Sequence, residues 1–156
     1  MTYSIYTIGI GNLPIQDFIK NLQKNSIDAV IDTRSKPYSL YRPDYNRKKL
    51  EQHLLANKIG YNFQGDKLGG LPNNPELYTN NLPDYEKIRK TIPYQQGLDY
   101  LEKGIEFNCS MALLCACSDY TKCHRYNLVG KDLERKGYEV IHILRNGEKM
   151  QERGLF

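Results

Sequence analysis

Cys123, His124 and Arg125 stand side by side and combine a thiol, an imidazole and a guanidinium. The spacing of apolar residues predicts a helix over 122–136, which places this triplet in the first turn. Free backbone N–H groups at a helix start attract anions, and an arginine there suits phosphate or carboxylate. The same field favours a thiolate at Cys123, and His124 can donate a hydrogen bond or transfer a proton. The alternative is that Cys123 is a buried apolar residue and that Arg125 pairs with a surface acid.

The four cysteines lie close together, at positions 109, 115, 117 and 123. No Lys or Arg precedes Lys20, so we expect no secretory signal and reduced thiols in a cytoplasmic protein. Three of these cysteines and His124 offer four soft or borderline metal ligands within ten residues. Zinc would accept them chemically, although their spacing matches no common zinc module. The sequence therefore requires no cofactor, and zinc stays an alternative.

A covalent mechanism is also open, with Cys115 or Cys123 as nucleophile and His124 or Asp32 as the acid–base group. A cysteine at a strand end, followed by a loop and an arginine on a helix, is similar to the layout of rhodaneses and tyrosine phosphatases. Their anion loop is shorter than the seven residues that separate Cys117 from Arg125. The likeness is therefore one of layout alone.

Two further groups of residues follow apolar runs. Asp32 and Arg34 come directly after a short buried run and could hold a ligand, or they could form an ordinary solvated strand end. Gly9 and Gly11, next to Asn12, would let the backbone approach a ligand closely. The glycine turn lacks the third glycine of a dinucleotide-binding fingerprint.

Residues 32–49 form a basic segment that is rich in tyrosine. Its six Lys or Arg against two acids give a surplus equal to the net charge of +4 of the whole chain. Arg42 lies near its middle, and Tyr38, Tyr41 and Tyr45 are interleaved with the charges. Such a segment can grip the phosphates of a nucleic acid and stack on its bases. The alternative is a solvated loop that runs into a helix.

Apolar periodicity predicts the elements that must position these residues. Strands are expected over residues 4–8, 29–31, 111–115 and 139–144. Helices are expected after Asn12, which would cap the first of them, and over residues 46–57, 94–103 and 122–136. Residues 58–92 are unassigned apart from a loop over 68–75. This alternation predicts one α/β domain over residues 1–156, with a mostly parallel sheet flanked by helices in a three-layer, Rossmann-like arrangement.

Composition agrees with a single globular domain, since 40% of the 156 residues are hydrophobic and 26% are charged. The longest apolar run, residues 111–117, is far too short to span a membrane, so no membrane partner is expected.

Segments 9–12, 32–34 and 115–125 each begin where a predicted strand ends. In a parallel sheet these ends share one edge, where ligands bind. We therefore expect an anion pocket there, formed by Asn12, Asp32, Arg34, Cys123, His124 and Arg125. Its ligand would carry phosphate, as a nucleotide or nucleic acid, because the basic segment extends the same surface. A non-catalytic nucleic-acid-binding module and a zinc-stabilised adaptor are the alternatives.

Six motifs together resemble the uncharacterised family called domain of unknown function 488. They are TIGIGN at 7–12, DTRSKP at 32–37, LGG at 68–70, LCA at 114–116, CHR at 123–125 and IHI at 141–143. The resemblance implies a compact α/β domain with these motifs gathered at one site. Members usually carry Ser where Gly11 stands and an acidic residue where Cys117 stands. An acid–base role at that second position therefore does not carry over, and an extra thiol stands there instead.

Overall fold

The computed structural model describes residues 3–151. Its main sheet has the strand order β3-β2-β6-β1-β7-β8, and all pairs are parallel except β7 with β8. The strands are β1 (Ser4–Gly9), β2 (Ala29–Asp32), β3 (Gly60–Phe63), β6 (Met111–Cys115), β7 (Glu139–Ile143) and β8 (Lys149–Met150). A separate hairpin pairs β4 (Tyr78–Thr79) with β5 (Leu82–Pro83). The predicted α/β class is confirmed.

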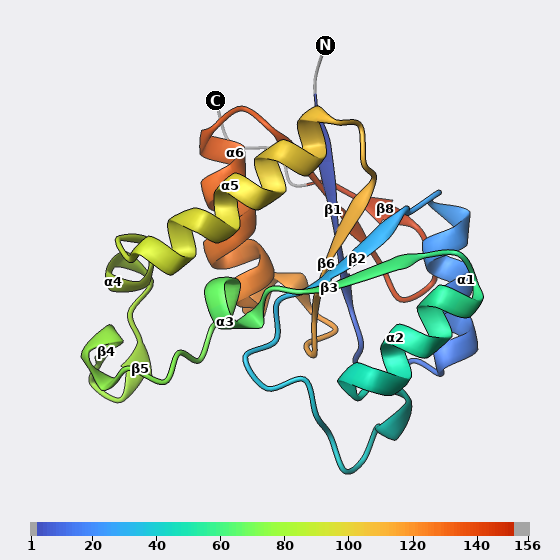
Figure 1. The fold of residues 1–156 in the computed structure, drawn as a ribbon, viewed down its shortest axis with the longest axis horizontal. Coiled ribbons are helices and arrows are strands. Elements are labelled where there is room, and N and C mark those ends of the chain that lie inside the picture. The colour runs from blue at the N-terminus through green and yellow to red at the C-terminus, as the bar shows by residue number, and fades with distance from the viewer. Residues whose placement is uncertain (1–2, 152–156) are drawn as a thin grey trace.

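Helices cover both faces of the sheet (Figure 1). They are α1 (Ile15–Lys24), α2 (Arg47–Ala56), α3 (Gly65–Leu68), α4 (Tyr85–Arg89), α5 (Ile92–Glu106) and α6 (Lys131–Arg135). Strand β6 shows how the layers form, because its side chains alternate between two cores. Met111 and Leu113 pack in the core that includes α5 and α6, whereas Ala112 and Leu114 pack in the core that includes α1 and α2. The three-layer prediction is confirmed.

Between residues 58 and 106, the short elements β3, α3, β4, β5 and α4 lie in the stretch left without a prediction, and α5 differs from its predicted bounds. Strand β3 was not predicted, because all four of its residues are only half-buried and carry no apolar alternation. Helix α5 runs past Gly104, where we expected it to end. A Cβ at Gly104 would lie 2.7 Å from the Met111 side chain, so this glycine provides close packing inside the helix rather than a stop.

The predicted helix over 122–136 is three pieces. A 3₁₀ turn at Tyr120–Lys122 is followed by Cys123 in an extended conformation, then by a π-helix at Arg125–Gly130 and by α6. The Cys123 carbonyl accepts hydrogen bonds from the N–H groups of both Tyr126 and Asn127. The Cys-His-Arg triplet therefore straddles the helix start, and it enters a wide π turn of the kind often found at functional sites.

The start of α1 also differs. Its N-cap is Pro14, with no side-chain cap, and Asn12 is exposed in the preceding turn rather than capping the helix. Gly11 has φ +53°, so the tight turn after β1 is made by backbone conformation instead of by a capping side chain.

His142 on β7 is buried, stacks on Tyr120 with ring centroids 3.6 Å apart, and is hydrogen-bonded through Nδ1 to Thr7 Oγ1 at 2.6 Å. Burial, helped by the nearby Arg125 charge, lowers the pKa of His142 to about 3.

This lowered pKa makes the fold sensitive to acid. Below pH 6.5 the unfolded chain takes up a proton at His142 that the folded chain refuses, so stability is full above that pH and falls as the pH drops towards 3. We expect the free energy of unfolding to fall by about 2 kcal/mol between pH 7 and pH 5 from this group. Urea unfolding at the two pH values checks this. His142→Phe should flatten the dependence, and an equally steep dependence in that variant would contradict the assignment.

Candidate functional site

A cavity of about 330 Å³ opens at the carboxyl ends of β2 and β6. These strands are neighbours, yet the chain leaves β2 towards α2 and leaves β6 towards α6, on opposite faces of the sheet. Such a switch point is where ligands bind in parallel α/β sheets. The cavity is lined by Arg34, Ser35, Lys36, Gly70, Leu71, Pro83, Tyr85, Cys115, Ala116, Cys117, Lys122, Cys123 and His124.

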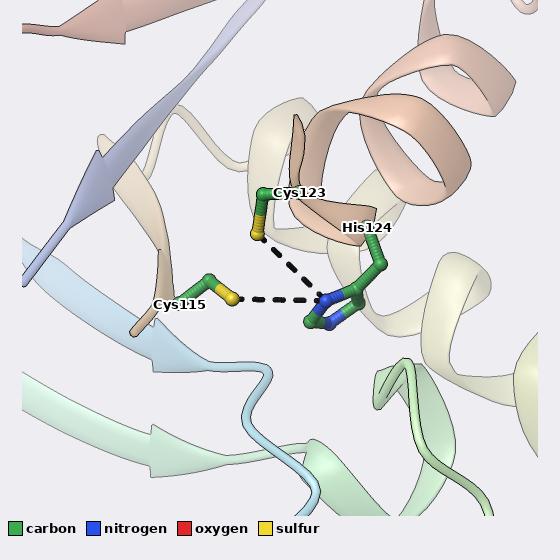
Figure 2. Close-up of side chains that lie close together, drawn as sticks. All are labelled: Cys115, Cys123 and His124. Carbon is green, nitrogen blue, oxygen red and sulfur yellow. Dashed lines mark hydrogen bonds between the residues drawn. The ribbon is translucent and has the colours of Figure 1, made fainter. Parts of the chain in front are cut away.

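Two thiols and one imidazole converge on the wall of this cavity (Figure 2). The Sγ atoms of Cys115 and Cys123 lie 3.7 Å and 3.8 Å from His124 Nδ1. Cys115 ends strand β6, and its carbonyl accepts from the N–H of Ile10, while the Leu114 carbonyl accepts from the N–H of Thr33. The end of β6 is therefore fixed to both neighbouring strands, so the Cys115 thiol is held rigidly.

The imidazole of His124 is oriented by its other nitrogen. Nε2 lies 3.0 Å from the carbonyl oxygen of Thr33, which can only accept, so Nε2 carries a proton and donates it. In the neutral ring, the Nδ1 lone pair therefore points at the two thiols. The ring also rests on Gly70, where a Cβ would lie 2.7 Å from its Cγ. Gly70 thus makes room for the imidazole.

The two buried thiols have opposite tendencies. A hydrogen bond from Cys123 holds the pKa of Cys115 well below the usual range of a thiol, and His124 lowers it further when its ring is protonated. The hydrogen bond with Cys115, together with burial, raises the pKa of Cys123. We expected the helix start to favour a thiolate at Cys123. The structure corrects this, because the acidic thiol is Cys115 and Cys123 is its donor.

Asp32 lies behind the cavity wall and holds Arg34. Its carboxylate accepts from Nε and Nη2 of Arg34 at 2.9 Å and 2.8 Å, and from the hydroxyl of Tyr61 at 2.7 Å. Arg34 also donates to the Tyr45 carbonyl oxygen. Arg34 lines the cavity and Asp32 does not, so the carboxylate positions the guanidinium.

Arg125 is almost completely buried and turns away from the cavity. Its Nη1 donates to the Cys117 carbonyl oxygen at 2.7 Å, and its Nη2 donates to that of Ser118 at 3.4 Å. Its guanidinium thereby fastens the loop after β6, the segment that carries Cys117. Arg125 is absent from the residues that line the cavity.

Three other predicted site residues also lie off the cavity wall. A Cβ at Gly9 would overlap the Cys117 carbonyl oxygen, so the close approach that this glycine permits is to the loop after β6. Asn12 is exposed in the turn before α1, and Arg42 is half-buried in the basic segment. The predicted site residues that meet at the cavity are therefore Arg34, Cys115, Cys123 and His124.

Sequence reasoning missed several of the residues that line the cavity. Lys36 and Lys122 add positive charge to its rim, and Tyr85 adds a hydroxyl. Burial and the nearby cysteines raise the pKa of Tyr85. Lys36 and Gly70 belong to the DTRSKP and LGG motifs that the family resemblance gathers at one site, whereas Tyr85 lies in the unassigned stretch and carries no local signal.

The family of the chain follows from a comparison with family models. The model described as "Domain of unknown function DUF488" matches residues 14–131, most of the chain. The chain belongs to this family. Four of the six motifs that carry the resemblance line the cavity of this DUF488 protein, at 32–37, 68–70, 114–116 and 123–125.

No curated protein and no solved structure matches the chain. Within the described residues 3–151, none of the helices combines the length and apolar character that crossing a bilayer requires.

Proposed function

We propose that this DUF488 protein binds single-stranded nucleic acid as its phosphate-bearing ligand. The strand would lie along the basic segment and enter the cavity. The observation that carries this proposal is the exposure of aromatic side chains among positive charges. Tyr38 is 70% exposed and Tyr41 is 93% exposed. Neither contributes to the core, so both are free to stack on bases.

Charge and position support the same ligand. Lys36 lies on the basic segment and lines the cavity together with Lys122, which comes from the segment after β6. Lys36 and Leu71 also border a second hollow of about 620 Å³, next to Asn73 and Asn80. A strand whose bases stack on the tyrosines thus has cationic and amide groups along its path towards the cavity.

Removal of both exposed tyrosines tests this proposal. Stacking contributes about 1–3 kcal/mol per base, so Tyr38→Ala with Tyr41→Ala should remove about 2–6 kcal/mol and weaken binding of a labelled single-stranded oligonucleotide by at least roughly 30-fold. Fluorescence anisotropy at fixed salt measures the affinity. Phe107→Ala is the matched control, because Phe107 is an aromatic residue that is 85% exposed and lies at the C-terminal end of α5, outside the basic segment.

Salt dependence and competitors complete the test. Neutralising Arg42 and Lys48 should each lower the salt slope by about 1 if they contact phosphates. Free nucleotide and duplex DNA serve as competitors, and displacement by free nucleotide alone would assign the site to a nucleotide instead. The proposal would be contradicted by an affinity that stays the same when salt is raised, when the two tyrosines are replaced and when Arg42 or Lys48 is neutralised.

A second candidate activity is thiol chemistry on the same ligand. It is favoured by Cys115, whose thiol lines the cavity and interacts with both the Cys123 thiol and the His124 imidazole. In this alternative Cys115 is the nucleophile, Cys123 stabilises its thiolate, and Arg34 neutralises ligand charge. In both candidate functions Asp32 positions Arg34, and Arg125 positions the loop after β6.

A further inference from the structure

The geometry points to a metal centre at the base of the cavity. We infer that Cys115, Cys123 and His124 bind a soft or borderline divalent cation of the zinc class, with its fourth position open to the cavity. Their ligand atoms all lie within 4.8 Å of one another. They come from two segments, the end of β6 and the helix start after it, that the fold brings together (Figure 2).

The separations between ligand atoms fit one central ion. A tetrahedral zinc with bonds of ~2.3 Å to sulfur and ~2.0 Å to nitrogen places a sulfur and a nitrogen ligand about 3.5 Å apart. Nδ1 of His124 lies 3.7 Å from one sulfur and 3.8 Å from the other. Both sulfur–nitrogen separations therefore lie within a few tenths of an ångström of the zinc geometry, and the two sulfurs lie within 4.8 Å of each other.

The outer contacts also match those of a metal-binding histidine. Such a histidine donates its second ring N–H to a carboxylate or a backbone carbonyl, which fixes the ring and the nitrogen that faces the metal. In this chain the acceptor is the Thr33 carbonyl at the end of β2, and Gly70 packs against the ring. The hydrogen bonds of Ile10 and Thr33 to the end of β6 hold Cys115 in the same way. Two of the three ligands, Cys115 and His124, are therefore preorganised by the ends of the strands.

The chemistry of the cavity wall selects the cation. Two thiolates and an imidazole suit zinc, whereas magnesium and calcium require oxygen ligands. Among the described residues that line the cavity there is no carboxylate. The site therefore disfavours hard cations.

The fourth position faces the cavity rather than a fourth protein ligand. Cys115 and Cys123 are buried, whereas Cys117 is exposed. The Cys117 thiol lies close enough to interact with both buried thiols. Its sulfur does not belong to the group of ligand atoms that all lie within 4.8 Å of one another. Three protein ligands and an open position are typical of catalytic zinc, which polarises a bound oxygen.

This inference deepens the proposed function, because an open zinc beside Lys36 and Lys122 would accept an oxygen of the phosphate-bearing ligand. That step rests on the proposed function, whereas metal binding itself does not. Thiolates held by zinc are not free nucleophiles, so the metal centre and the thiol alternative exclude each other in the loaded protein.

Cobalt(II) titration of the reduced, metal-free protein tests the inference. Cobalt replaces zinc in thiolate sites and becomes strongly coloured there. We expect one equivalent to give the absorption of tetrahedral thiolate-bound cobalt, and one equivalent of zinc to bleach it. Competition with a chelating indicator then gives the zinc affinity. Weak, uncoloured or superstoichiometric binding would overturn the inference.

Serine variants locate the ligands. Cys115→Ser, Cys123→Ser and His124→Gln should each lower zinc affinity by at least about 100-fold, since loss of an outer contact alone costs about 10-fold to 100-fold. Cys109→Ser is the matched control, because Cys109 precedes the opposite end of β6 and should leave affinity unchanged. Cys117→Ser should change it only a few-fold, and a loss as large as that of Cys115→Ser would overturn the open fourth position. Circular dichroism of each variant separates lost ligands from lost folding.

The test of the metal centre can be separated from the test of nucleic-acid binding. Nucleic-acid binding is measured on metal-free Cys115→Ser, and metal binding is measured without nucleic acid. A coloured cobalt complex without oligonucleotide binding supports the metal centre and rejects the proposed ligand. Oligonucleotide binding with a fast-alkylating Cys115 that zinc does not protect rejects the metal centre and favours the thiol alternative.

Discussion

Asp32→Ala should lower the free energy of unfolding by about 3–5 kcal/mol, because it leaves a charged guanidinium buried without its partner. Asp32 is fully buried and makes two hydrogen bonds to the side chain of Arg34 and one to the hydroxyl of Tyr61. Urea unfolding measures the change. Asp44→Ala is the control, since the exposed pair of Asp44 with His53 should contribute at most about 1 kcal/mol.

A second substitution separates the lost charge pair from the lost packing. Arg34→Met in the Asp32→Ala background removes the unpaired guanidinium and should recover part of the lost stability. If the double variant is less stable than Asp32→Ala, or if Asp32→Ala costs under about 1 kcal/mol, the carboxylate does not hold Arg34 as described.

Zinc should stabilise the folded chain strongly, because the three ligands converge only in the folded state. Free zinc at about 1,000 times its dissociation constant adds about 4 kcal/mol, provided that the unfolded chain does not bind it. For a domain of this size that corresponds to a rise in Tm of roughly 8–16 °C. Thermal unfolding in buffered free zinc measures it. The rise should persist in Cys109→Ser and vanish in Cys115→Ser, and an equal rise in both would mean non-specific binding.

The sequence predicts the central part of the fold because burial there is continuous. The run from Met111 to Cys115 is buried at every residue, and both its type and its bounds were predicted. The edge strand β3 escapes the same reasoning, since Gly60–Phe63 pairs on one side only and is half-buried throughout. This strand forms because it pairs with β2. Such a tertiary contact cannot be predicted from the local periodicity of the sequence.

The position of the candidate site in the sheet could be predicted from the sequence, but the contacts of its side chains could not. Ends of parallel strands share an edge, so the meeting of the segment after Asp32 with Cys115 and His124 follows from the pattern alone. The destination of a long side chain does not. Arg34 turns back to Asp32, only two positions earlier, and Arg125 turns to the carbonyl of Cys117, which the path of the loop after β6 brings within reach.

The protonation of the thiols has the same origin. A helix start predicts an acidic Cys123, but the contact that decides the matter is the hydrogen bond between Cys123 and Cys115, eight positions earlier in the chain. A direct hydrogen bond to the charged form of one thiol lowers its pKa and raises that of the thiol that donates it. Spacing did not predict that both sulfurs would face one imidazole nitrogen.

The most direct measurement is X-ray absorption at the zinc edge of protein loaded with one equivalent of zinc. We predict a four-coordinate centre with two sulfur neighbours at ~2.3 Å, one imidazole nitrogen at ~2.0 Å and one further light atom from the cavity. The Cys115→Ser variant should lose one sulfur neighbour and Cys109→Ser should lose none. A spectrum with only oxygen and nitrogen neighbours, or one unchanged by Cys115→Ser, would contradict a metal centre at Cys115, Cys123 and His124.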